Sequence, residues 1–254
     1  MREFFGFNGY SRPAEGFLSW QHLTFVTALM VVMTVLSIIL GKKYCNRTSD
    51  EKNKVLMISA FLIDGFELFK IAVLCLRSGS LSPVLYELPL FLCSIQLITI
   101  PLAAFAQGRT KEAALDFVCI FGLLGAVMGT YGAGNNYGTY HVLSMDNVVS
   151  GITHSISGFC ALYIFLSGMT SLKKKNIPIS LGILFAFCIG AYGANHLLDY
   201  NYMFLMRGDG TPYDIFFNLL NGHRVFYPLT VVGLFVAYIS AFYHIYFFCK
   251  RRSS

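Results

Sequence analysis

Seven separated runs of apolar residues constrain this chain more than any other feature. Each run is about long enough for a helix that crosses a bilayer, since a hydrocarbon core of about 30 Å takes roughly 20 helical residues. The runs lie at 22–41, 55–76, 85–107, 112–133, 147–170, 178–200 and 225–249. Hydrophobic residues make up 56% of the 254 residues and charged residues only 13%, which excludes an ordinary soluble domain. The sequence therefore predicts an all-α, polytopic membrane protein with seven transmembrane helices, forming a single domain over residues 1–254.

The basic residues predict the orientation of these helices. With seven spans, the first, third and fifth connections share one side with the C-terminus. Lys and Arg resist translocation, so the side that holds most of them is expected to be cytoplasmic. The N-terminus is then outside and the C-terminus cytoplasmic, in the plasma membrane if the protein is bacterial. Most of the 19 basic residues lie on the expected cytoplasmic side: Lys42, Lys43, Arg47, Lys52, Lys54, Arg109, Lys111, Lys173, Lys174, Lys175, Lys250, Arg251 and Arg252.

Charge and cysteine spacing exclude several functions. The formal net charge of +6 comes from residues that flank helices, so nucleic-acid binding is not expected. The seven cysteines form no C-x-x-C pair, so the sequence predicts no metal site, and no organic cofactor is indicated. Membrane lipids are the expected partners.

Polar residues gather in the outer halves of the predicted spans. His154 lies about 10 Å along the fifth span from its outer end, and Cys93 has a similar depth in the third. Charged groups at such depth cost a few kcal/mol each unless they are paired or hydrated. We therefore expect one polar pocket that opens outward. Its other candidate residues are Asp64, Glu67 and Lys70 in the second span, Gln96 in the third, and Asn195, His196 and Asp199 in the sixth.

The residue types in this pocket are suited to nucleophilic catalysis. A thiol needs a nearby base to become a thiolate at neutral pH, and histidine is the usual partner. Cys93 and His154 meet if the third and fifth spans pack together, and Asn195 or Asp199 then orients the imidazole. A site at this depth lies near the ester linkages of a lipid, so we expect acyl transfer or ester hydrolysis. The alternative interpretation is structural: an ion-pair network on the second span, an inert thiol and a buried histidine.

Four segments also carry a family resemblance. They are Phe-Phe-Gly-Phe at 4–7 with Ser-Trp-Gln-His at 19–22, Glu-Leu-Pro-Leu-Phe-Leu-Cys-Ser-Ile at 87–95, His154 with Ala-Leu-Tyr at 161–163, and Asn-Tyr-Met-Phe-Leu-Met-Arg at 201–207. In these the chain resembles the YwaF-like integral membrane proteins, which are relatives of the mammalian transmembrane ether-phospholipid acyltransferase family. The resemblance implies an acyltransferase in which Cys93 accepts the acyl group and His154 is the general base. The chain departs from the family pattern at Phe91, where histidine is usual; if that histidine is essential, activity is altered or lost.

Two other functions fit the same topology. A transporter or solute-binding protein would use Asp64, Glu67 and Lys70 as a polar relay and would need a wet route to the cytoplasm. The inner halves of the spans hold little beyond Asp116 to line such a route. A seven-helix receptor is the third alternative. Residues 225–249 contain no lysine for a retinal Schiff base, which argues against the retinal version.

Overall fold

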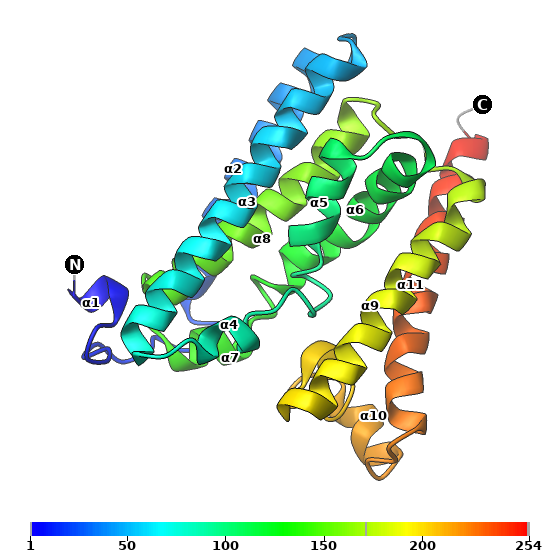
Figure 1. The fold of residues 1–254 in the computed structure, drawn as a ribbon. Coiled ribbons are helices and arrows are strands. Elements are labelled where there is room, and N and C mark those ends of the chain that lie inside the picture. The colour runs from blue at the N-terminus through cyan, green and yellow to red at the C-terminus, as the bar shows by residue number, and fades with distance from the viewer. Residues whose placement is uncertain (1, 171, 253–254) are drawn as a thin grey trace.

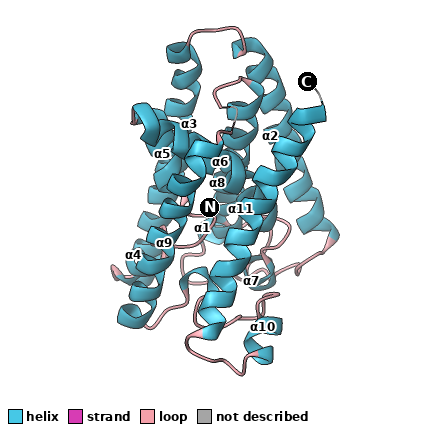
Figure 2. Ribbon diagram, turned by 90° about the vertical axis from the view of Figure 1, so that its right-hand side faces the viewer, coloured by secondary structure: helices cyan, strands magenta, loops and turns pink. Residues whose placement is uncertain are grey.

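The computed structural model describes residues 2–170 and 172–252, and these residues form helices and connections without a strand (Figures 1 and 2). The longer helices run side by side in alternating directions (Figure 1). They are α2 (Trp20–Tyr44), α3 (Ser49–Ser78), α5 (Gln96–Phe105), α6 (Gly108–Met128), α8 (Met145–Leu166), α9 (Ile177–Leu198) and α11 (Phe226–Arg252). The short elements are α1 (Arg2–Phe5), α4 (Ser82–Tyr86), α7 (Gly134–Thr139), η1 (Lys174–Asn176), η2 (Tyr202–Phe204) and α10 (Asp214–Leu219).

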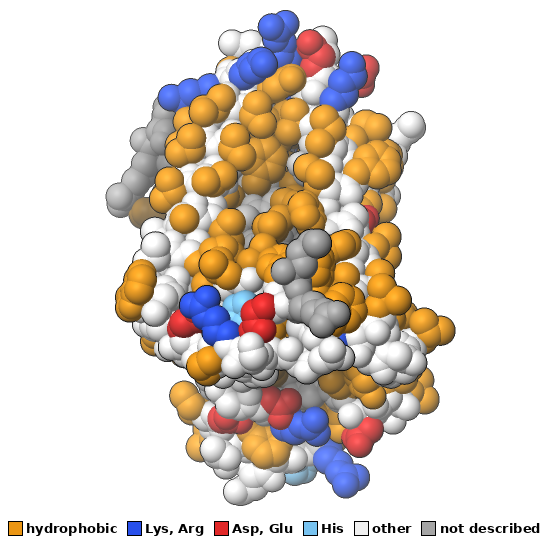
Figure 3. Space-filling model, turned by 90° about the vertical axis from the view of Figure 1, so that its left-hand side faces the viewer, with side chains coloured by type: hydrophobic (Ala, Val, Ile, Leu, Met, Phe, Trp, Pro, Cys, Tyr) orange, Lys and Arg blue, Asp and Glu red, His pale blue; other side chains and the backbone are white. Residues whose placement is uncertain are grey.

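The two ends of the bundle differ in charge and in structure. The lysine-rich end holds the α2–α3 and α8–α9 connections and the C-terminus. The opposite end holds α1, α4, α7 and α10 (Figure 1). Figure 3 shows hydrophobic side chains covering the middle of one face, with Lys and Arg gathered above them. Ile58 and Phe61 of α3 are 60% and 69% exposed, as expected for side chains that contact lipid.

Four helices are long and apolar enough to cross a membrane: Trp20–Tyr44, Met145–Leu166, Lys174–Leu198 and Phe226–Arg251. These helices confirm the prediction of a helical membrane protein. The other three long elements are α3 and α6, which carry more charge, and α5, which has only 10 residues. The number of seven spans and their orientation stay predictions.

The centre of the bundle is α6, whose residues 113–122 are all buried. It packs against α5, α8 and α9, while α2 and α3 pack against α8 rather than against each other. Asp116 of α6 is fully buried, and its carboxylate connects the elements that meet at the lysine-rich end of the bundle. Its carboxylate accepts hydrogen bonds from the Thr170 hydroxyl, from Asn176 Nδ2 at 2.9 Å and from the Tyr243 hydroxyl at 3.4 Å. The α8–α9 connection and α11 are thereby attached to the central helix.

The N-terminal segment is attached at the opposite end. Arg77 of α3 forms two hydrogen bonds of 2.8 Å with the Asp146 carboxylate at the start of α8. The Tyr10 hydroxyl donates to the same carboxylate. Burial raises the pKa of Tyr10 to about 12, and the hydrogen bond to Asp146 adds to that shift. The Glu15 carboxylate accepts from the backbone N–H of Val142 at 2.7 Å, so residues before α2 lie against the start of α8.

The structure differs from the prediction at 85–107, which is not one helix. α4 ends at Tyr86, residues 87–95 are non-helical, and α5 begins at Gln96. Pro89 has no N–H to donate and disfavours helical geometry at Leu88, so a continuous helix is disfavoured at this position. Ser94 stabilises the turn that follows, since its hydroxyl accepts from the N–H of Phe91 at 3.0 Å and lies 3.2 Å from the Phe91 carbonyl oxygen. Cys93 therefore lies in a break, just before a helix N-terminus.

Candidate functional site

The imidazole of His154 is held by its own helix. Nδ1 lies 2.7 Å from the carbonyl oxygen of Ser150, one turn earlier in α8. A carbonyl oxygen only accepts, so Nδ1 carries the hydrogen and Nε2 of the neutral ring has a free lone pair. Sequence reasoning had expected Asn195 or Asp199 in the orienting role, and the Ser150 carbonyl takes that role. The ring can accept a proton only through Nε2.

The structure brings Cys93 and His154 together. The two side chains are near enough to interact electrostatically, and both are half-buried. Because Ser150 occupies Nδ1, Nε2 is the nitrogen that is left to accept a proton from the thiol. The expected meeting of the third and fifth predicted spans is thus present, although the cysteine comes from the break before α5 rather than from a helix.

Two glycines at the C-terminal end of α6 lie against this pair: Gly125 in its last turn and Gly129, which caps it. A Cβ on Gly129 would lie 1.8 Å from Cδ2 and 2.0 Å from Nε2 of His154. A Cβ on Gly125 would lie 3.4 Å from the Cβ of Cys93. α6 therefore forms the wall against which both reactive side chains rest. Sequence reasoning missed this role, but the signal was available: Gly-Ala-Val-Met-Gly at 125–129 is a G-x-x-x-G pattern, which permits close helix approach in membranes.

The charged residues of α3 form an ion-pair cluster beside this dyad. Lys70 Nζ lies 2.7 Å from Glu67 and 2.9 Å from Glu87, which follows α4. Lys70 is also near enough to His154 to interact with it electrostatically. Asp64 is an electrostatic neighbour of Glu67, and its Oδ1 is buried without a hydrogen-bond partner among the described residues. Glu87 was not among the predicted site residues, although it lies near the start of the predicted span at 85–107.

The remaining predicted residues divide between this site and other places. Gln96 is fully buried in the first turn of α5; its Oε1 accepts from Thr99 at 3.1 Å, and its Nε2 has no partner among the described residues. Asn195 bonds to the backbone of Tyr202 through both amide atoms, at 3.0 and 2.6 Å. It therefore fastens the connection after α9. His196 and Asp199 are exposed at the end of α9, and His196 lines a separate pocket.

Phe91, which stands where histidine was expected, is part of an aromatic cluster. Its ring centroid lies 5.4 Å from that of Tyr202 and 5.8 Å from that of Phe204. Tyr202 also donates its hydroxyl to the carbonyl oxygen of Leu85. The segment that carries Cys93 is thus covered by the connection after α9, and Phe91 contributes to that cover.

An all-helical chain with four apolar helices of membrane-spanning length is an integral membrane protein. The family comparison agrees with this class. The TMEM164 family model matches residues 17–246, so the chain belongs to the TMEM164 family, a family of transmembrane proteins. No curated protein and no solved structure matches the chain.

Proposed function

We propose that this protein is a membrane lipid acyltransferase or esterase, with Cys93 as nucleophile and His154 as general base. The observation that carries the proposal is the pairing of these two side chains in a helix break. Non-helical backbone at membrane depth is tolerated only where protein covers it or where it lines a cavity, and broken helices mark binding sites in other membrane proteins. The resemblance to the YwaF-like proteins and to ether-phospholipid acyltransferases supports the same reaction class.

The proposed reaction has two steps. His154 Nε2 takes the thiol proton, and the Cys93 sulfur attacks the carbonyl carbon of a lipid ester. The ester C–O bond breaks, the imidazolium gives its proton to the departing alcohol, and the acyl group remains on sulfur as a thioester. A second hydroxyl, from a lysolipid or from water, then loses its proton to His154 and takes the acyl group, which restores the thiol.

Gln96 is suited to stabilise the oxyanion that forms in each step. Its Nε2 donor is buried and has no acceptor among the described residues, and it follows Cys93 by three positions. A buried donor without a partner costs about 1–3 kcal/mol, which a developing negative charge can offset. Cys93 also lies three residues before α5, so the positive end of that helix dipole is close to it and favours negative charge there.

We also propose seven spans, with α3, α5 and α6 joining the four apolar helices. The charges of α3 are compatible with this, because Lys70 pairs with Glu67 and Glu87 instead of facing lipid. The lysine-rich end would then be cytoplasmic. In that orientation the dyad lies in the outer half of the bilayer and acts on the outer leaflet.

The decisive experiment compares cysteine variants in purified protein. With a phospholipid labelled in its acyl chain, Cys93→Ala and His154→Gln should lose transfer and hydrolysis, whereas Cys75→Ala should retain both. Mass spectrometry of the unmodified protein should find a hydroxylamine-sensitive acyl adduct on Cys93. Undiminished turnover by Cys93→Ala refutes the proposal.

A further inference from the structure

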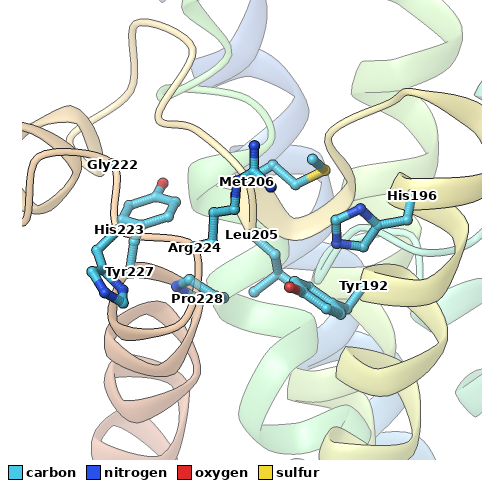
Figure 4. Close-up of a pocket in the computed structure, with 9 residues that line it drawn as sticks. All are labelled: Tyr192, His196, Leu205, Met206, Gly222, His223, Arg224, Tyr227 and Pro228. Carbon is cyan, nitrogen blue, oxygen red and sulfur yellow. The ribbon is translucent and has the colours of Figure 1, made fainter.

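A second pocket lies at the end of the bundle opposite the lysines, between α9 and α11. Its volume is about 220 Å³, and we call it the α9–α11 pocket. His196 comes from the last turn of α9, and His223 and Arg224 precede α11. Figure 4 shows His196 and Tyr192 on one side, His223 and Tyr227 on the other, and the Arg224 side chain between them. Leu205, at the end of the η2 segment, forms part of the wall.

Arg224 differs from its neighbours in having no carboxylate partner. At the same end of the molecule, Arg12 pairs with Glu15 at 2.5 Å, Arg77 with Asp146 at 2.8 Å and Arg207 with Asp209 at 2.8 Å. Among residues 2–170 and 172–252 no such pair includes Arg224, and no acidic residue lines the pocket. The pocket therefore holds several hydrogen-bond donors, and no carboxylate of the described residues neutralises the charge of its arginine.

The histidine beside Arg224 is fixed as a donor. His223 Nδ1 accepts from the backbone N–H groups of Val225 at 3.3 Å and Phe226 at 3.4 Å. With Nδ1 acting as acceptor, the ring hydrogen is on Nε2, which is left to donate. The ring is braced against Phe226, with 4.6 Å between centroids. His196 is braced in the same way against Tyr192, also at 4.6 Å. These contacts hold the donors in place before a ligand arrives.

We propose that the α9–α11 pocket binds a phosphate group, and that this phosphate belongs to the headgroup of a membrane phospholipid. Arg carries several donors in a planar fork that matches phosphate oxygens, and basic pockets between membrane helices bind lipid headgroups. The surroundings favour a lipid over a soluble anion. α9 and α11 are both of membrane-spanning length, and exposed apolar side chains flank the pocket, with Leu197 86% and Leu229 61% exposed.

The pocket is connected to the segment that carries Cys93 through the η2 segment. Leu205 follows Phe204, whose ring packs on Phe91, two residues before Cys93. The inference therefore deepens the proposed function by assigning a binding site for the headgroup of the lipid substrate, and it depends on that function for the claim that the bound lipid is a substrate. Phosphate binding itself is measurable without turnover.

The test measures ligand-dependent unfolding midpoints of the full-length protein in detergent. The probes are dihexanoyl phosphatidylglycerol, dihexanoyl phosphatidylcholine, dihexanoylglycerol and inorganic phosphate. We expect both phospholipids to raise the midpoint saturably and dihexanoylglycerol to have no saturable effect. Arg224→Gln should weaken the apparent phospholipid affinity at least tenfold, Arg224→Lys should retain part of it, and Arg207→Gln, which removes a paired charge at the same end, should bind as the parent protein does.

Three outcomes overturn the inference. Equal binding of dihexanoylglycerol excludes phosphate recognition, binding of inorganic phosphate alone excludes the lipid, and full affinity in Arg224→Gln excludes the pocket. If Arg224→Gln does not fold, Arg224→Lys and His223→Phe provide the same comparison. Cys93→Ala is included to separate the two proposals: it should bind phospholipid normally. Normal binding together with retained turnover in Cys93→Ala would refute the nucleophile and leave the phosphate site in place.

Discussion

Gly129→Ala tests the geometry of the dyad without removing either reactive group. The new Cβ would lie 1.8 Å from Cδ2 of His154, whereas carbon atoms in ordinary contact are about 3.5–4.0 Å apart. Gly129 has φ −78°, so alanine meets no backbone obstacle, and the conflict is entirely with the ring. His154 or α8 must therefore retreat by more than about 1 Å, which separates Nε2 from the Cys93 thiol.

Two magnitudes follow from this displacement. Overfilling a close contact costs about 1–3 kcal/mol of folding free energy. A misplacement of about 1 Å at a reacting group costs on the order of 10²-fold in rate. We therefore expect Gly129→Ala to lower the unfolding midpoint moderately and to reduce acyl transfer about a hundredfold. The alkylation rate of Cys93 by iodoacetamide should also fall, because the thiol loses its proton acceptor.

Peptide-resolved mass spectrometry separates the alkylation of Cys93 from that of Cys75 in the same sample, so Cys75 is an internal reference. Gly65→Ala is the matched control. It lies inside α3, a Cβ there meets nothing within 4 Å, and helix propensity predicts a gain of up to about 1 kcal/mol. An unchanged Cys93 alkylation rate and an unchanged unfolding midpoint in Gly129→Ala would show that His154 does not rest against α6.

Three further predictions concern stability. Asp116→Ala should destabilise the protein by about 3 kcal/mol, because the buried donors of Thr170, Asn176 and Tyr243 lose their acceptor; a thermal unfolding midpoint equal to that of the parent refutes this. Arg77→Gln leaves the Asp146 carboxylate without its cation at a largely buried position, so it should cost about 3–5 kcal/mol and make residues 2–19 accessible to protease, whereas Arg12→Gln should not. The third concerns pH. The Glu51 carboxylate accepts hydrogen bonds from the backbone N–H of Thr48, which has the larger effect, and from the Thr48 hydroxyl, and both lower the pKa of Glu51 below the usual 4.5. The stabilisation that the ionised carboxylate gives the start of α3 is therefore present above pH 4.5 and is lost as the pH falls through the lowered pKa. The protection factors of the amides at the start of α3, which correct the exchange rate for its intrinsic dependence on pH, should therefore fall below pH 4.5 in the parent protein and depend less on pH in Glu51→Gln.

The apolar runs predicted most helices because lipid contact imposes a length and a composition that side-chain packing does not alter. α8 and α9 lie within a few residues of the runs that predicted them. The break at 87–95 was not predicted, although Pro89 stands near the start of the run at 85–107. Hydropathy averages over the proline, whereas its missing N–H and the restriction that it places on Leu88 act on the backbone.

The pairing of Cys93 with His154 was predicted from depth along two spans, and that reasoning depended only on the helical rise. The groups that position the pair could not be predicted by that reasoning. The Ser150 group that positions His154 is a backbone carbonyl, which every residue type has, so the sequence does not reveal it. Gly129 matters because it has no side chain where the His154 ring lies. Asn195 has a residue type common in active sites, but both of its amide atoms are used by Tyr202. Residue type alone could not separate these cases.

The ten residues of α5 have a consequence for biogenesis. A helix of that length extends about 15 Å, half of the hydrocarbon thickness, and the preceding residues 87–95 are not helical. This segment by itself would not be stable in lipid when the translocon releases it. If α5 is one of the seven proposed spans, residues 82–105 need cover from α6 and, later in synthesis, from the connection after α9. Truncation before residue 200 should leave an assembly intermediate for membrane quality control to remove.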